Sequence, residues 1–184
     1  MKRFAVALAA FTALDGVVAH MAPASGQSTS GQSASGQSNG EAAAIFEGKL
    51  PPGYRDWKLI SVAHEEGNLN DLRAILGNDV AVTASREGKL PYPDGAIIAR
   101  LAWTYHPLEE SEKAFGHAQS FVAGPPKNGV QFMVKDSKKY AATGGWGFAH
   151  FNDGKPADEA ALNTCFSCHE TVKDRDFVFN RYAR

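Results

Sequence analysis

The sequence predicts an α+β fold that is mostly β, in which short helices accompany an antiparallel sheet. Three observations support this class. Short segments alternate apolar and polar residues, as half-buried strands do. Clusters of Gly, Pro, Asn and Asp separate these segments, for example at residues 91–95. The helical stretches are few and short, and the folded part, expected over residues 46–184, has the length of one ordinary domain.

Two segments precede this domain, and the first has the features of an export signal. Residues 1–3 are Met-Lys-Arg, an apolar run follows over residues 4–14, and small residues occur at 17–19. This order is typical of a secretory signal peptide, here residues 1–19, and the run is short for a membrane span. We therefore expect a periplasmic protein without stable membrane insertion, with an uncleaved membrane anchor as the alternative.

The second segment, residues 20–45, has the composition of a linker. Between residues 25 and 40 the tetrapeptide Ser-Gly-Gln-Ser occurs three times with a period of five residues. Such a segment has too little apolar surface to offset the entropy lost on ordering. We interpret residues 20–45 as a disordered Ser/Gly/Gln-rich spacer.

The domain begins with two strand patterns, at residues 58–64 and 72–76. In the first, Ile60 and Val62 are expected to share one face because side chains alternate along a strand. A short helix is predicted over residues 80–87, since an Asn–Asp pair can cap its start and a glycine follows its end.

Residues 96–106 give the clearest strand pattern of the chain. Arg100 stands in the middle of this otherwise apolar strand and shares a face with Ile98 and Ala102. A cation at such a position is a candidate site residue, and the alternative is an arginine in solvent or paired with a structural carboxylate.

The rest of the domain continues the same pattern. Residues 124–126, Gly-Pro-Pro, are predicted to form a loop, and strands are predicted over 130–135 and 146–151. Residues 152–154, Asn-Asp-Gly, favour a hairpin-type turn. A helix over 156–162 would then carry the chain into the most informative motif of the sequence.

That motif is Cys165-Phe166-Ser167-Cys168-His169. It reads C-x-x-C-H, the sequence that attaches a c-type haem. The two thiols add to the haem vinyl groups, and the imidazole becomes the proximal ligand of the iron. The alternatives are a disulfide, half of a zinc site, or a redox C-x-x-C. A zinc site needs a second ligand pair and a redox motif a βαβ context, and the sequence offers neither.

The net charge of −1 gives no indication of nucleic-acid binding, which a basic excess would favour. We therefore expect one covalently bound haem c per chain, close to the C-terminus of a strand-rich domain. Only Met133 could supply a second, sulfur ligand from within the domain.

The domain resembles the cytochrome P460 family. The resemblance covers about residues 50–184 and rests on several motifs. These are Tyr54-Arg55-Asp56-Trp57-Lys58, Gly77-Asn78-Asp79, Pro93-Asp94-Gly95 with Ala102-Trp103, Phe132 to Tyr140, Gly144-Gly145-Trp146-Gly147-Phe148, the haem motif with Glu170, and Arg175-Asp176-Phe177-Val178-Phe179.

The resemblance implies a β-rich homodimer with one five-coordinate haem per subunit. In one branch a lysine is joined covalently to the haem, and the protein oxidises hydroxylamine and passes electrons to an external acceptor. In the related cytochrome c′-beta branch the cross-link is absent, and the protein binds or scavenges nitric oxide or carbon monoxide. The resemblance thus leaves open an oxidoreductase or a gas-binding protein.

The cross-linking lysine of the first branch is expected on the strand after Pro93-Asp94-Gly95, where this chain carries Arg100. A guanidinium stays protonated and is a poor nucleophile compared with an amine. In this register the cross-link is absent, and Lys58 and Lys89 are the nearest other lysines in the sequence. We expect Arg100 to act on the haem or its ligand through charge-assisted hydrogen bonds.

Other residues are weaker candidates for the site. Any of four histidines could be a distal ligand or a base, and Glu170 could accept a hydrogen bond from the ring of His169. Phe177 to Phe179 could cover a haem edge. Six further phenylalanines could wall a pocket, although core packing is the more ordinary role. The histidines are His64, His106, His117 and His150, and the phenylalanines are Phe46, Phe115, Phe121, Phe132, Phe148 and Phe151.

Overall fold

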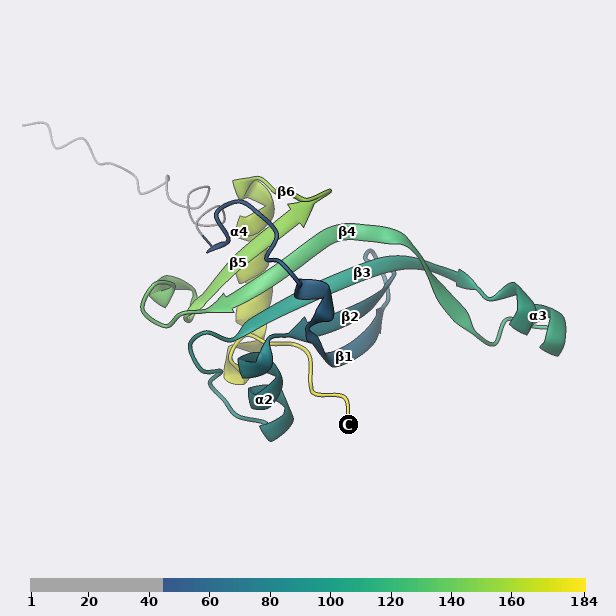
Figure 1. Ribbon diagram of the computed structural model, residues 1–184, viewed down its shortest axis with the longest axis horizontal. Helices are drawn as coiled ribbons and strands as arrows, with labels where there is room; N and C mark the ends of the chain where they lie inside the picture. Colours follow the sequence, from purple (N-terminus) through teal and green to yellow (C-terminus); the bar gives the residue numbers. More distant parts are fainter. Residues whose placement is uncertain (1–44) are drawn as a thin grey trace, which may run out of the picture. The chain divides into compact units, whose positions relative to one another are not determined.

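The computed structural model describes residues 45–184, except for the side chains of residues 159–161 and 163. Six strands form one antiparallel sheet in which every strand lies beside its neighbours in sequence (Figure 1). The strands are β1 (Lys58–Glu65), β2 (Asp71–Gly77), β3 (Ile97–Pro107), β4 (Phe121–Lys135), β5 (Trp146–Asn152) and β6 (Lys155–Pro156). The predicted fold class, mostly antiparallel β with short helices, is confirmed.

Short helices connect and follow the strands. They are the 3-10 helices η1 (Tyr54–Asp56), η2 (Ala141–Thr143) and η3 (Glu170–Arg175), and the α-helices α2 (Asp79–Glu87), α3 (Glu109–Phe115) and α4 (Glu159–His169). Helix α2 has the predicted ends, because the Asn78 side chain accepts a hydrogen bond from the Ala81 backbone N–H and Gly88 adopts a left-handed conformation.

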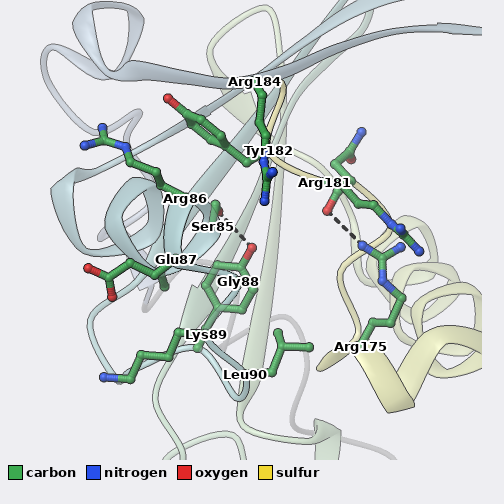
Figure 2. A pocket seen from close by; sticks show the side chains of 13 residues that line it. Ser85, Arg86, Glu87, Gly88, Lys89, Leu90, Arg175, Arg181, Tyr182 and Arg184 are labelled. Carbon is green, nitrogen blue, oxygen red and sulfur yellow. Dashed lines mark hydrogen bonds between the residues drawn. The ribbon is translucent and has the colours of Figure 1, made fainter.

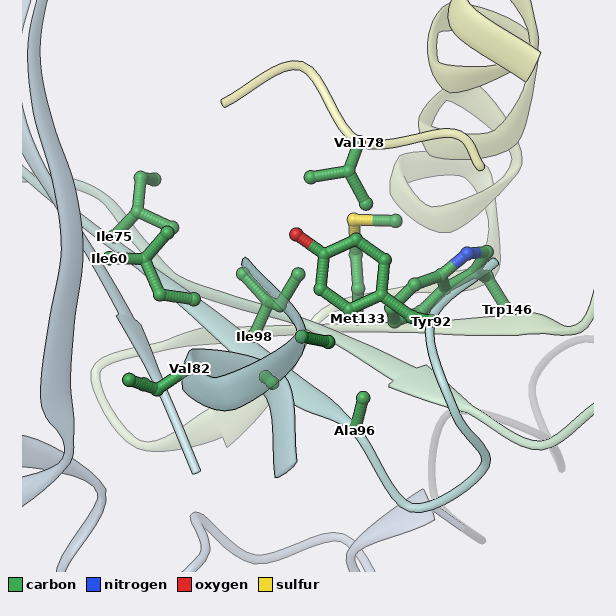
Figure 3. Close-up of a cluster of buried hydrophobic side chains, with 11 residues drawn as sticks. Ile60, Ile75, Val82, Tyr92, Ala96, Ile98, Met133, Trp146 and Val178 are labelled. Atoms are coloured by element: carbon green, nitrogen blue, oxygen red, sulfur yellow. The ribbon is translucent and has the colours of Figure 1, made fainter. Parts of the chain in front are cut away.

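The sheet is covered on both faces, and each face has its own core. The first face carries Ile98, Arg100 and Ala102 of β3. Its core also includes residues of α2 and of the C-terminal segment, which is the part of the chain after α4, residues 170–184. Figure 3 shows Tyr92, Met133 and Trp146 packed together in this core, with Val178 from the C-terminal segment above them. The first face is therefore the side on which the haem motif and the tail approach the sheet.

The second face carries Ala99, Leu101 and Trp103 of β3. Its core, which includes Phe132 and Phe151, is closed by the segment that precedes β1. This segment packs five side chains against the core: Ile45, Phe46, Leu50, Tyr54 and Trp57. In Figure 1 this segment, with η1, lies in front of the sheet, and α4 lies behind it. The two faces are thus closed by opposite ends of the described chain.

Strand β1 departs from simple alternation. A register shift between Leu59 and Ser61 marks a β-bulge, and Ile60 and Ser61 are both buried. Val62 is 65% exposed, so the prediction that Ile60 and Val62 share a face is wrong. The bulge inserts an extra residue and resets which side chains face the core.

Strand β4 is longer than the sequence predicted. Residues 124–126, predicted to be a loop, belong to this strand, and Pro126 is paired with Trp103 of β3. Strand β5 pairs with β4 only from Val130 onward, so the earlier part of β4 is a sheet edge. Prolines are tolerated there because a second neighbouring strand is absent.

Helix α4 extends further than predicted and includes the whole haem motif. The short strand β6 takes the place of the predicted helix start, and its hairpin turn at residues 152–154 is as predicted. Within residues 45–184 no helix combines the length and the apolarity that a membrane span requires. The predicted signal peptide and nearly all of the predicted linker lie outside the described residues.

Candidate functional site

Helix α4 brings the three residues of the haem motif together beside β5. Cys165 and Cys168 are one helical turn apart, and His169 is the last residue of the helix. Neither cysteine is in a disulfide, so the disulfide alternative is not realised in this structure. Burial raises the pKa of the Cys165 thiol, with a further contribution from Cys168, whose side chain is exposed.

The ring of His169 is held in one tautomer. Its Nδ1 atom lies 2.7 Å from the backbone oxygen of Phe177, and because a carbonyl can only accept, Nδ1 donates. The other ring nitrogen is then unprotonated. Burial lowers the pKa of His169, although the carbonyl bond opposes this shift. A neutral imidazole fixed in this way is the form that binds a metal ion.

The hydrogen-bond acceptor for His169 is therefore a backbone carbonyl, whereas Glu170, which the sequence suggested, has an exposed side chain. Asp176 holds that carbonyl in place. Its carboxylate accepts bonds from Lys135 Nζ at 2.6 Å and from the Tyr92 backbone N–H at 2.8 Å. Its backbone oxygen accepts a bond from the Trp146 indole at 2.8 Å.

Aromatic side chains surround His169. The ring centroids of Phe148 and Phe179 lie 5.3 Å and 5.1 Å from that of His169. Phe166, inside the motif, stacks on Phe177 at 5.8 Å and also approaches Phe148. Phe148 and Phe179 thus lie against His169, and Val178 packs in the first core. That residues 177–179 cover a haem edge stays a prediction. Of the other phenylalanines, Phe46, Phe132 and Phe151 pack in the second core, and Phe115 and Phe121 are exposed.

Arg100 belongs to a polar network on the first face of the sheet. Its Nη2 atom lies 2.7 Å from Asp71 Oδ2, and its Nη1 atom lies 3.4 Å from Gln131 Oε1. Asp71 is completely buried and also accepts a bond from Arg73 at 2.8 Å. Burial, followed by repulsion from Arg73, lowers the pKa of Arg100. The guanidinium nevertheless stays charged, because its ordinary pKa is so high.

The register of the sheet relates this network to the haem motif. Gln131 of β4 pairs with Arg100 on one side and with His150 of β5 on the other. His150 stands two residues after Phe148, so both side chains leave β5 on the same face. The polar row of Arg100, Gln131 and His150 therefore lies on the face that His169 approaches, one step along the strands from Phe148.

The remaining candidates lie elsewhere. The ring of His64 is hydrogen-bonded to the Tyr105 hydroxyl, and the rings of His106 and His117 are within hydrogen-bond distance of nearby backbone oxygens. All three histidines are exposed. Lys58 forms an exposed ion pair with Asp79, and Lys89 lies after α2. Met133 is buried in the first core.

Sequence reasoning missed Asp71, Gln131 and the Phe177 carbonyl. The sequence shows Gln131 as a polar residue that alternates with Val130 and Phe132 within a strand. It does not show that Gln131 pairs with Arg100 of the neighbouring strand. No group of three or more His, Cys, Asp or Glu side chains in the described part of the chain forms a cluster that could hold a metal ion.

The residues fit a covalently attached haem. Two cysteines outside any disulfide and a histidine lie on the last turns of one helix, the histidine presents an unprotonated nitrogen, and phenylalanine rings flank it. A comparison with known families agrees, because the model of the family described as Cytochrome P460 matches residues 51–180. A search of the curated proteins finds no match.

Proposed function

The chain belongs to the cytochrome P460 family and is a haem-binding cytochrome, and we propose that it is a periplasmic mono-haem c-type cytochrome that binds and oxidises hydroxylamine or small nitrogen oxides. The observation that carries this proposal is the state of His169. Its Nδ1 proton is committed to the Phe177 carbonyl, so the opposite nitrogen is available to one iron ion.

Cys165 and Cys168 would hold the haem through thioether bonds, and His169 would be its proximal ligand. When bound, the haem supplies an iron that coordinates a small nitrogen compound and accepts its electrons. Both cysteine sulfur atoms and the imidazole that would hold the haem come from helix α4, so a single haem per chain is expected. Met133 does not compete as a ligand because it packs in the first core with Tyr92 and Trp146.

The chain's own residues orient the substrate and handle its protons. The guanidinium of Arg100 is held by Asp71 and Gln131 and can donate to an oxygen atom of a small ligand. His150, in the same row, donates from Nε2 to the Asn128 backbone oxygen at 2.9 Å, so its Nδ1 atom can accept a proton that hydroxylamine releases on oxidation. The electrons pass to an external acceptor, and the protein is expected to act as a homodimer.

A second candidate function is nitric oxide or carbon monoxide binding without turnover, as in the cytochrome c′-beta branch. Arg100 favours it, because this residue stands where a lysine would form the cross-link, and its guanidinium is already engaged with a buried carboxylate. Such a protein would keep the proximal histidine and the small-ligand site but would lack the lysyl bond.

The deciding experiment is the visible spectrum of the purified ferrous protein together with its intact mass. Loss of hydrogen beyond the mass of the processed chain plus one haem, with a strongly red-shifted spectrum, would reveal a lysyl cross-link and support the hydroxylamine-oxidising branch. The mass of the processed chain plus one haem, with an ordinary c-type spectrum, would support the second candidate. Turnover of hydroxylamine with a dye acceptor then supports the enzyme, and tight nitric oxide binding without turnover supports the second candidate. A colourless protein with the mass of bare polypeptide would contradict both.

A further inference from the structure

A cleft of about 430 Å³ lies away from the polar row, between the end of α2 and the C-terminal segment. Figure 2 shows that its basic side chains come from both segments. They are Arg86 and Lys89 at the end of α2, and Arg175, Arg181 and Arg184 from the C-terminal segment.

These five cations are not neutralised by the chain. Glu87 is the only carboxylate side chain that lines the described cleft, and none of the five forms an ion pair with a described residue. Arg86 lies over the ring of Tyr182, which fixes its position without removing its charge. Since the whole chain carries a net charge of −1, this concentration of positive charge is local.

The cleft is connected to His169 through Phe179. The ring of Phe179 packs edge-on against that of His169 and is 43% exposed, so it links the proximal histidine to the surface. Arg175, which lines the cleft, donates to the Phe179 carbonyl at 2.7 Å and to the Asn180 carbonyl at 3.3 Å. The cleft therefore borders the backbone of Phe179, whose side chain contacts His169.

We propose that this basic surface docks an electron-accepting protein with an acidic face, and that electrons leave through Phe179. The proposal rests on the proposed attachment of haem at His169. Leu90 is an exposed apolar side chain that lines the cleft among its cations, and Phe179 is a second exposed apolar residue; a mixed apolar and charged patch is typical of a protein interface. A site for a small anion would instead need buried donors that converge on one point.

The test reverses two charges of the cleft, Lys89→Glu with Arg181→Glu, in the haem-loaded protein. Both side chains are exposed. The matched control is Lys138→Glu with Lys139→Glu, an exposed pair on the turn after β4 that changes the net charge equally. The dithionite-reduced proteins are oxidised by ferricyanide, an anion, and by tris(phenanthroline)cobalt(III), a cation.

We expect the cleft variant to slow oxidation by ferricyanide roughly tenfold at low salt and to speed oxidation by the cobalt complex, since local charge changes association rates by about 10-fold to 1,000-fold. The control variant should stay within about twofold of the wild type, because its charges do not line the cleft and dissolved salt screens exposed charges. Phe179→Leu should slow both oxidants. Equal effects of both charge variants, or none, would overturn the docking surface.

Binding is also measured without electron transfer, by calorimetric titration with a decaglutamate peptide and with inorganic phosphate. Binding of the peptide that the cleft variant loses and the control keeps supports an acidic protein partner. Phosphate binding of equal strength at the cleft would overturn it in favour of a small-anion site. These outcomes are separable from the proposed function, because hydroxylamine turnover with a neutral dye does not require docking, and a protein without haem would overturn both proposals.

Discussion

His169 owes its chemistry to a carbonyl eight residues further along the chain. The bond to Phe177 fixes which ring nitrogen is free, and burial among Phe148 and Phe179 keeps the ring neutral. Arg100 likewise takes its role from its neighbours, because a completely buried Asp71 fixes the direction of the guanidinium. At the scale of single residues, the partner of a side chain therefore decides what the side chain can do.

Arg100→Ala should weaken nitric oxide binding by the ferrous protein roughly tenfold, since a charge-assisted hydrogen bond contributes about 1.5–3 kcal/mol. The matched control is Arg73→Ala, which removes the same charge and the other arginine partner of Asp71. Ligand affinity and midpoint potential are measured for both variants. Equal losses in the two would show that the effect comes from the Asp71 network and that Arg100 does not reach the ligand.

Asp94 gives a prediction about pH. Hydrogen bonds from the Ser137 hydroxyl and backbone N–H lower the pKa of Asp94. A carboxyl with a lowered folded pKa stabilises the fold above its unfolded pKa, and this contribution is lost as the pH falls through the folded value. The Tm difference between wild type and Asp94→Asn should therefore shrink below about pH 4, the ordinary range for Asp. A Tm difference that stays constant below pH 4 would contradict this role of Asp94.

That Cys165, Cys168 and His169 lie together could be predicted, because they are close in sequence, and their role in attaching a haem stays a prediction. The position of Asp71 could not be predicted, because it stands at the very start of its strand and meets Arg100 only through strand pairing. The Phe177 carbonyl was also invisible, since a backbone atom leaves no signature in composition. Groups of residues that are close in sequence could be predicted here, whereas contacts between segments far apart in the sequence became visible only in the structure.

At the scale of elements, the same distinction separates α2 from β4. The ends of α2 follow from Asn78 and Gly88, which act within one turn of the helix. The Gly-Pro-Pro segment of β4 has the local signature of a loop, yet it pairs with β3 at the edge of the sheet. Shifts in register on either side of Trp103 accommodate the pairing. Only the identity of the neighbouring strands decides between the two outcomes.

The buried ion pair between Lys135 of β4 and Asp176 predicts how the tail is held. Asp176→Asn should destabilise the protein by about 3–5 kcal/mol, since it leaves a buried cation without its partner. The matched control is Asp79→Asn, because Lys58 and Asp79 are also 2.6 Å apart but are exposed to solvent. Urea denaturation should show little change for the control. Similar losses in both variants would contradict a special role for the buried pair.

The same variant should alter the haem, because Asp176 is directly before Phe177 in the chain, and both residues have positive φ angles, 52° and 63°. A loosened segment would weaken the carbonyl bond to His169. We expect a shifted midpoint potential for Asp176→Asn and an unchanged one for Asp79→Asn. An unchanged potential in a folded, destabilised Asp176 variant would show that the ion pair supports the fold without setting the proximal bond.

At the scale of the whole molecule, the sheet needs cover on both faces, and the two covers come from opposite ends of the described chain. The C-terminal segment and α2 close the first face, which holds the candidate site. The segment before β1 closes the second face over Phe132 and Phe151. The site depends on the second face as well, because Phe132 and Met133 are neighbours on β4 and point to opposite cores.

This arrangement predicts where the chain can be shortened. Removal of residues 20–44, with the signal peptide retained, should leave the Tm unchanged, since the composition of this segment is that of a linker with little apolar surface. Removal of residues 20–57 should cost on the order of 5 kcal/mol, at about 1 kcal/mol for each of the five half-buried side chains Ile45, Phe46, Leu50, Tyr54 and Trp57. That is comparable with the whole stability of a domain, roughly 5–15 kcal/mol. We therefore expect poor haem loading and loss of cooperative unfolding only for the longer deletion, as measured by absorbance and calorimetry. Full loading and a wild-type Tm after the longer deletion would show that the second face needs no cover.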